Sequence, residues 1–135
     1  MTDWIRVQLP TGPSDELGPL QLAWLGDAVW EMHQRLRRCQ KPGRSKDLHI
    51  AVVSEVEAAA QSKALEVLDP YLSPIEKDLV RRGRNKAGRG PRKGDAAVYG
   101  KATGFETMIG WLFLKNPQRL ARLLDRLEET ESDLQ

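Results

Sequence analysis

The chain has 135 residues, of which 40% are hydrophobic and 30% are charged, and its 21 Lys and Arg against 19 Asp and Glu give a formal net charge of +2. This length predicts one domain, residues 1–135, large enough to bury a core without a disulfide or a structural zinc. The single cysteine, Cys39, excludes both. The first residues lack the basic flank and apolar run of a signal peptide, and no stretch of about 18 apolar residues predicts a membrane span. A cytoplasmic protein with no membrane partner is expected.

The small net charge conceals an uneven distribution. Seven basic residues and no acid lie between Arg81 and Lys93, so the rest of the chain holds 14 basic and 19 acidic residues. We call residues 81–93 the cationic segment. A concentrated positive patch on an otherwise acidic chain points to a polyanionic partner.

Residues 1–17 are expected to form an irregular lead-in, because Pro10, Gly12 and Pro13 interrupt any regular pattern. A long helix is predicted from about Leu20 to Arg38, where apolar residues recur at steps of three and four. This stripe consists of Leu22, Leu25, Val29, Met32 and Leu36. Trp24, Ala28 and Trp30 widen it, so the first half of the helix is expected to be buried nearly all round, with both tryptophans in the core.

Three helices are predicted in the middle of the chain. The first runs from Ser45 to Val53, and the second from Ser54 to Leu68, opened by a capping box of Ser54 and Glu57. The third begins at Ser73, Pro74 and Glu76, a capping box with proline at the first helical position, and runs into the cationic segment. Glycines and Pro91 predict a basic flexible loop over residues 83–94.

Two apolar helices are predicted to complete the chain. One runs from Ala96 to Lys115, and the other begins at Asn116 and Pro117, a cap followed by proline. No alternating pattern typical of a strand occurs. The fold class is therefore predicted to be all-α, a helical bundle.

Two apolar windows each contain a single acid: Asp27 within residues 22–30 and Glu106 within residues 102–114. A carboxylate on a buried helix must be paired, protonated or bound to a metal. Glycines beside both acids indicate that another backbone approaches closely. If the two helices cross there, the acids face each other, and Mg²⁺, which accepts one or two carboxylates plus water and phosphate oxygens, would relieve their repulsion. A salt bridge from each acid to an Arg or Lys elsewhere is the alternative.

Two segments resemble the ribonuclease III family. Residues 22–29, LAWLGDAV, are similar to its signature helix, and residues 101–114, KATGFETMIGWLFL, to its second acidic helix. The closer resemblance is to the Mini-III ribonucleases, dimeric relatives that have the catalytic domain and lack the double-stranded RNA-binding domain. Residues 46–49 and 81–85 also resemble that subfamily.

The resemblance implies a ribonuclease III-like fold, a homodimer, and a Mg²⁺-dependent endoribonuclease that cleaves double-stranded RNA to 5′-phosphate and 3′-hydroxyl ends. Asp27 and Glu106 match the family's acids, so they are the implied catalytic and metal-binding residues. The implied substrate is a precursor of large-subunit (23S) ribosomal RNA. The sequence departs from the larger relatives at Ala23 and Thr103, where those proteins carry a second glutamate and aspartate, and it keeps the reduced set of acids that the Mini-III group has.

The cationic segment is the predicted RNA-binding element, because proteins recognise double-stranded RNA by its shape through phosphate and 2′-hydroxyl contacts. The predicted contact residues are Arg81, Arg82, Arg84, Asn85, Lys86, Arg89, Arg92 and Lys93. Two alternatives remain open. A catalytically idle, RNA-binding or ribosome-associated structural protein would explain Ala23 and Thr103, and a helical protein-interaction module would bind an acidic protein.

Overall fold

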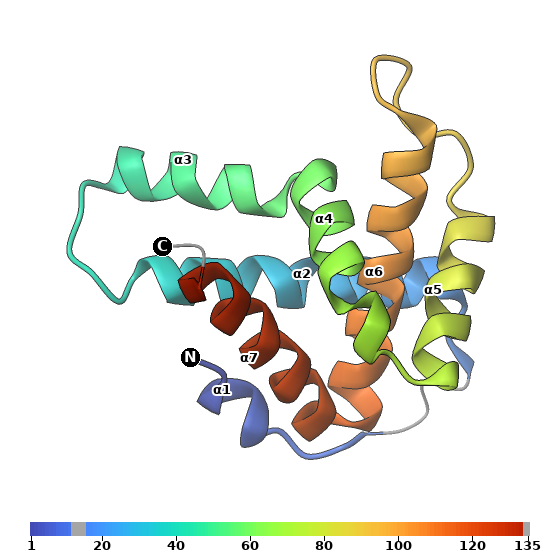
Figure 1. Ribbon diagram of the computed structural model, residues 1–135, viewed down its shortest axis with the longest axis horizontal. Coiled ribbons are helices and arrows are strands. Elements are labelled where there is room, and N and C mark those ends of the chain that lie inside the picture. The colour runs from blue at the N-terminus through green and yellow to red at the C-terminus, as the bar shows by residue number, and fades with distance from the viewer. Residues whose placement is uncertain (12–15, 134–135) are drawn as a thin grey trace.

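The computed structural model describes residues 1–11 and 16–133, and these residues form helices and no strand (Figure 1). In chain order the elements are α1 (Asp3–Arg6), α2 (Pro19–Arg38), α3 (Ser45–Val56), α4 (Ala58–Leu68), the 3-10 turn η2 (Asp69–Tyr71), α5 (Pro74–Lys86), α6 (Ala96–Lys115) and α7 (Pro117–Asp133). The all-α prediction is confirmed. No helix in the described part of the chain is long and apolar enough to cross a membrane.

The strongest helix-start signals in the sequence are confirmed. Ser73 caps α5: its hydroxyl accepts a hydrogen bond from the Glu76 backbone N–H at 3.3 Å, and the Glu76 carboxylate accepts one from the Ser73 N–H at 2.8 Å. α6 spans the predicted residues, and α7 begins at Pro117 after Asn116, whose side chain accepts from the Arg119 N–H at 3.2 Å. Local capping chemistry therefore sets these boundaries.

Three predicted boundaries are wrong. The lead-in contains the short helix α1, which docks on α7 because Thr2 and Arg6 both bond to Asp125. The break between α3 and α4 lies at Glu57, and the Ser54 side chain of the expected cap lies outside the described part of the chain, as do Gly12 and Pro13. α5 continues through the first part of residues 83–94 to Lys86, so the irregular connection is limited to residues 87–95.

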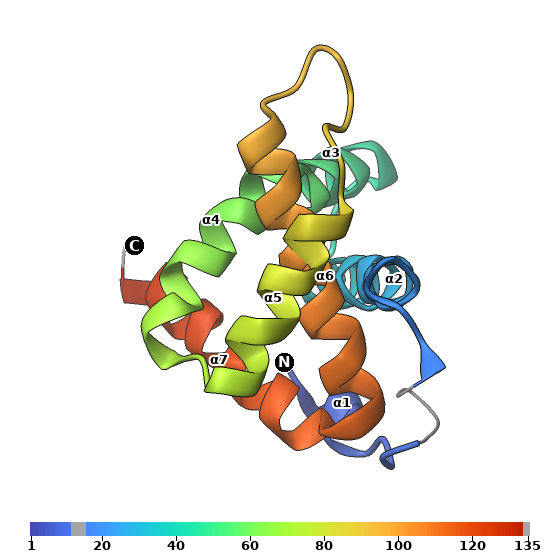
Figure 2. The same cartoon turned by 90° about the vertical axis from the view of Figure 1, so that its right-hand side faces the viewer.

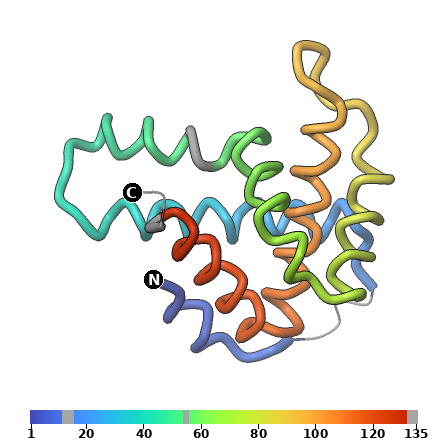
Figure 3. The backbone as a smooth tube through the Cα atoms, viewed as in Figure 1, coloured from blue at the N-terminus to red at the C-terminus, as the bar shows by residue number. Residues whose placement is uncertain are grey.

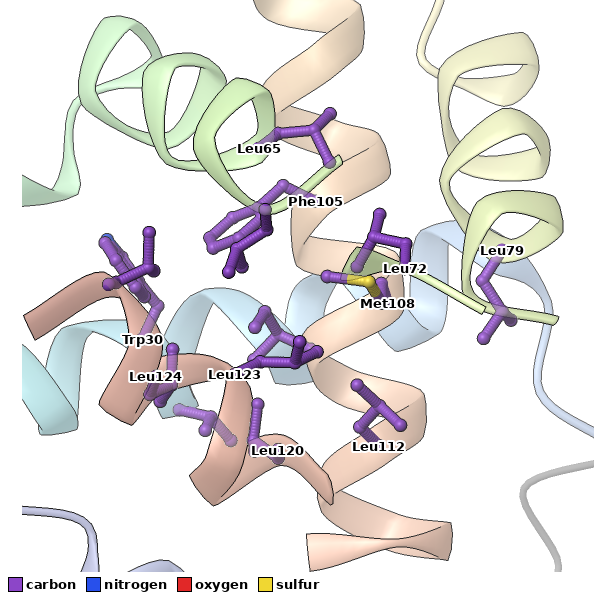
Figure 4. Packing of buried hydrophobic residues seen from close by; sticks show 14 of the residues in the cluster. Trp30, Leu65, Leu72, Leu79, Phe105, Met108, Leu112, Leu120, Leu123 and Leu124 are labelled. Atoms are coloured by element: carbon purple, nitrogen blue, oxygen red, sulfur yellow. The ribbon is translucent and has the colours of Figure 1, made fainter. Parts of the chain in front are cut away.

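α6 is the central helix, and α2, α4, α5 and α7 pack against it (Figures 1 and 2). Half of its residues are buried, and Phe105, Met108 and Ile109 are fully enclosed. Figure 4 shows Phe105 and Met108 among leucines from α4, α5 and α7, which belong to one core. The acidic window of residues 102–114 therefore runs through the middle of the molecule.

Only one side of α2 is covered by the rest of the chain. Leu22, Val29 and Trp30 are buried, whereas Trp24 is 81% exposed and Met32 is 51% exposed. Figure 2 shows α2 end-on at the margin of the bundle. The expectation that the first half of α2 is buried nearly all round, with Trp24 in the core, is wrong because no described helix covers its outer face.

The connection between α5 and α6 projects from the bundle, as the backbone trace in Figure 3 shows. Gly88 and Gly90 have φ angles of 70° and 78°, which L residues with side chains rarely adopt. The Arg89 guanidinium donates to the backbone carbonyls of Pro91, Arg92 and Gly94, so it holds the loop together.

Candidate active site

The helices that carry Asp27 and Glu106 cross at two glycines. A Cβ atom placed on Gly26 of α2 would lie 1.9 Å from the Glu106 carbonyl oxygen, and one on Gly110 of α6 would lie 2.0 Å from the Leu22 carbonyl oxygen. Only glycine allows backbones to approach so closely. This confirms the expectation that glycines beside the two acids mark a close approach, and the crossing places Asp27 next to Glu106.

The two acids interact at this crossing. Burial, a hydrogen bond shared with the Asp27 carboxyl and the negative charge of Asp27 together raise the pKa of Glu106 from 4.5 to about 8. Asp27 itself is exposed, and Glu106 is half-buried. No salt bridge to Arg or Lys involves either residue in the described part of the chain, so the alternative that each acid is neutralised by a basic side chain fails.

The arrangement fits a divalent cation that prefers oxygen ligands. One of two adjacent carboxyl groups holds a proton up to about pH 8, because two ionised carboxylates would repel each other. A cation that replaces this proton removes the repulsion. The described residues contain no cluster of three or more His, Cys, Asp or Glu suited to a metal. A site with two carboxylates and otherwise water suits Mg²⁺ better than zinc, which takes three or four protein ligands.

The two positions at which the sequence lacks further acids are both buried. Ala23 is 7% exposed and lies one turn before Asp27, and Thr103 is 6% exposed. The Thr103 hydroxyl donates to the Tyr99 carbonyl at 3.0 Å within α6. Neither position supplies a carboxylate, so the protein ligands available are those of Asp27 and Glu106.

Gln61 of α4 also interacts with the site, although it is not among the site residues predicted from the sequence. Its side chain lowers the pKa of Glu106, whereas Asp27 raises it. It is 2% exposed, and its face of α4 also carries Leu65 and Leu68. A polar residue at four and seven residues from two core leucines was the available signal.

The first part of the cationic segment lies on α5, which packs against α6. α5 packs on α6 at Gly83 and Gly104, whose Cα atom would lie 2.8 Å from a Cβ on Gly83. A Cβ on Gly104, which lies two residues before Glu106 in α6, would meet the Arg84 side chain at 3.0 Å. Arg81, Arg84 and Asn85 also line a cavity of about 290 Å³ with Lys77 and Asp69.

The predicted RNA-binding residues fall into two groups. Arg81 is paired with Asp78, and Arg89 is engaged with the backbone of its own loop. The other six side chains are exposed and make no hydrogen bond or ion pair with described residues: Arg82, Arg84, Asn85, Lys86, Arg92 and Lys93. The five cations of this second group are free to contact phosphates.

Comparison with known proteins agrees with this geometry. Residues 20–117 match the Ribonuclease III domain family. The Mini-ribonuclease 3 of Synechococcus sp. is 45% identical over 92% of this chain and 90% of its own, and that of Gloeobacter violaceus is 46% identical over 80% of each chain. A crystal structure of a Fusobacterium nucleatum protein superposes with a TM-score of 0.79 at 26% identity, covering 89% of this chain and 99% of that one. The chain belongs to the ribonuclease III family, a family of endoribonucleases, and groups with its Mini-ribonuclease 3 members.

Proposed function

We propose that this protein is a Mg²⁺-dependent endoribonuclease that cleaves double-stranded RNA at Asp27 and Glu106. The observation that carries the proposal is the glycine crossing of α2 and α6, which places these two carboxylates side by side and raises the pKa of Glu106 to about 8. Structural proteins rarely keep two mutually repelling acids together, whereas active sites use such pairs.

The chain's own residues hold the reacting groups. Asp27 and Glu106 supply oxygens from two rigid helices, so their spacing is fixed before RNA binds. When bound there, Mg²⁺ supplies activation of a water molecule and neutralisation of the charge that develops on the phosphodiester. In-line attack by water on the phosphorus, with the 3′ oxygen as the leaving group, would leave 5′-phosphate and 3′-hydroxyl ends, and no side chain needs to act as a nucleophile.

The exposed cations of the cationic segment would hold the RNA backbone. Arg82 and Lys86 lie on α5, which packs on α6, while Arg92 and Lys93 lie on the projecting loop at the start of α6. Both groups therefore flank the helix that carries Glu106. Phosphate contacts of this kind position a duplex without reading its sequence.

One experiment separates this proposal from its alternatives. The purified protein is incubated with double-stranded RNA with and without Mg²⁺, and cleavage and binding are both measured. Cleavage that requires Mg²⁺ supports the enzyme. Binding without cleavage identifies an idle RNA-binding protein. If the protein neither binds nor cleaves the RNA, the protein-interaction module is the remaining alternative.

A homodimer is the second part of the proposal. Leu20, Trp24, Ala28 and Met32 follow one another at four-residue steps on the uncovered face of α2, and all are exposed. Leu20 is 50% and Trp24 is 81% exposed. A contiguous apolar stripe of this size on a folded chain marks an interaction surface, and a second copy of the chain would pair α2 with α2 and bring two Asp27 sites into one particle.

Light scattering after size-exclusion chromatography tests the dimer. The wild-type chain should elute as a dimer and Trp24→Glu as a folded monomer. Ile75→Glu, a matched change at a residue of α5 that is 61% exposed, should remain a dimer. A dimeric Trp24→Glu variant would show that this face is not the interface.

The proposed substrate is a paired terminus of a large-subunit ribosomal RNA precursor, which places the protein in the cytoplasm. The likeness to Mini-ribonuclease 3 proteins supports this choice. Competition between such a precursor stem and a duplex of equal length and unrelated sequence measures the preference. Equal cleavage of both would limit the proposal to double-stranded RNA in general.

A further inference from the structure

Gln61 is a buried amide on an apolar helix face. It is 2% exposed and shares its face of α4 with Leu65 and Leu68, which belong to the core. The Gln61 Nε2 atom is buried and has no hydrogen-bond partner among the described residues. A buried donor without a good partner lowers stability, so an apolar residue would suit this position better if packing were its only role.

The Gln61 side chain interacts with the Glu106 carboxyl. α4 packs along α6, and a salt bridge of 3.1 Å from Lys101 Nζ to Glu66 Oε1 ties the same two helices together. The contact with Gln61 favours the ionised form of Glu106 and so lowers its pKa. Three helices therefore converge on one carboxyl: α2 through Asp27, α4 through Gln61, and α6, which carries Glu106 itself.

We propose that Gln61 is a positioning residue: when Glu106 is ionised to hold a cation, the unpaired Gln61 amide donates a hydrogen bond to one oxygen of Glu106 and leaves the other oxygen directed toward Asp27. The proposal rests on the function given above, because the oriented oxygen is one that a divalent cation would bind. A glutamate has three rotatable side-chain bonds, and a fixed donor confines it to one conformation before the cation arrives. Groups that orient a metal ligand in this way typically change metal affinity by 10- to 100-fold.

The chemistry of an amide suits this position. A leucine or methionine would fill the space and donate nothing. A glutamate would add a third negative charge beside two carboxylates that already repel each other. Glutamine donates without adding charge, so it stabilises the ionised carboxylate in a site that has few acids.

The test measures cation binding with Mn²⁺ alone, as a probe detected by electron paramagnetic resonance, in the absence of RNA. Gln61→Met keeps the length and removes the amide, and it should weaken Mn²⁺ binding by about 10- to 100-fold while the chain remains folded. Gln34→Met is the matched control, because Gln34 is equally buried, at 1% exposed, and instead accepts a hydrogen bond from Arg37 at 2.9 Å. That control should bind Mn²⁺ like the wild type.

Cleavage provides a second readout that a purely structural role would not move. In Gln61→Met the Mg²⁺ concentration for half-maximal cleavage should rise by about the same factor, and the rate at saturating Mg²⁺ should return to within a few-fold of wild type. RNA binding without metal should be unchanged. Unchanged Mn²⁺ affinity in Gln61→Met would overturn the proposal.

A third measurement uses no variant at position 61. The side-chain amide resonance of Gln61 should shift when Mg²⁺ is added to the wild-type chain and should not shift in Glu106→Gln. A shift that persists in Glu106→Gln would contradict the positioning role. If Glu106→Gln binds Mn²⁺ with wild-type affinity, the proposed function itself fails. If only Gln61→Met keeps wild-type affinity for Mn²⁺, Glu106 is a ligand without help from Gln61.

Discussion

Gly26 of α2 and Gly110 of α6 meet backbone to backbone, and a Cβ added to Gly26 would lie 2.9 Å from the Gly110 nitrogen. This contact sets the distance between the two helices. Asp27 follows Gly26 directly, and Glu106 lies one helical turn before Gly110. The separation of the two carboxylates therefore depends on the absence of a side chain at both glycines.

Gly26→Ala should destabilise the chain by about 3 kcal/mol or more, because the new methyl group meets backbone atoms that cannot move without separating α2 from α6. Gly100→Ala is the control, since nothing lies within 4 Å of a Cβ there and alanine favours a helix by up to about 1 kcal/mol. Urea unfolding of both variants gives the comparison. A Gly26→Ala chain as stable as wild type would contradict the close crossing.

Asp27→Asn and Glu106→Gln should each lower cleavage of double-stranded RNA by more than about 100-fold, because even an outer partner of a metal ligand contributes 10- to 100-fold. RNA binding should change little. Single-turnover cleavage at saturating RNA measures the loss. A variant that cuts at the normal rate would remove that residue from the mechanism.

Glu106→Gln should also be more stable than wild type in metal-free buffer at pH 8.5. The folded chain keeps Glu106 protonated up to about pH 8, whereas the unfolded carboxyl ionises near 4.5. Stability contributed by the protonated form is therefore lost as pH rises from 4.5 to 8. The amide removes this loss, and we expect a gain of at least about 1 kcal/mol, since one pKa unit corresponds to about 1.4 kcal/mol.

The affinity for Mg²⁺ should rise with pH, whereas the stability of the metal-free chain falls. A ligand must lose its proton before it binds a metal, so the apparent affinity should fall by up to about tenfold for each pH unit below about 8. Calorimetry in buffers of different ionisation enthalpy should detect nearly one proton released per Mg²⁺ at pH 7. Proton release that is absent in the wild type would contradict the shared proton at Asp27 and Glu106.

Four of the free cations in the cationic segment should account for much of the salt dependence of RNA binding. Replacing Arg82, Lys86, Arg92 and Lys93 with alanine should flatten the slope of log K against log salt by about 3, at somewhat less than one unit for each lost phosphate contact. Arg35→Ala with Arg44→Ala, two exposed and paired arginines outside the cationic segment, is the control. An unchanged slope in the fourfold variant would show that these residues do not touch RNA.

His33 should make the chain less stable as the pH falls below 6.5. Trp4 Nε1 donates to His33 Nδ1 at 3.3 Å, and His33 Nε2 lies 3.0 Å from Glu128 Oε1. Burial, aided by the charges of Arg37 and the N-terminus, lowers the pKa of His33 from 6.5 to about 4.

The unfolded chain therefore takes up a proton on His33 below pH 6.5, and the folded chain does so only near pH 4. The free energy of unfolding should drop by about 2 kcal/mol between pH 7 and pH 5 from this residue alone. His33→Gln should lose this part of the pH dependence. If the free energy of unfolding depends on pH in the same way in His33→Gln and in the wild type, the predicted role of His33 is wrong.

The sequence by itself determined most of the helices and both acids. Capping residues such as Ser73 and Asn116 act within one turn, so their effect can be predicted from neighbouring residues. The isolation of Asp27 and Glu106 in apolar windows was likewise visible along the chain, as was the concentration of cations in residues 81–93.

Tertiary structure decided which surfaces of these helices are covered. Periodicity shows that α2 has an apolar stripe, but it cannot show that Trp24 lies outside the buried face, because that depends on where α6 crosses. Gly83 is a second example. As a helix breaker it predicted a loop, whereas in the fold it lies within α5 and allows α5 to contact α6. Gln61 became visible only when α4 brought it to Glu106, because contacts between distant segments depend on packing that no local pattern encodes.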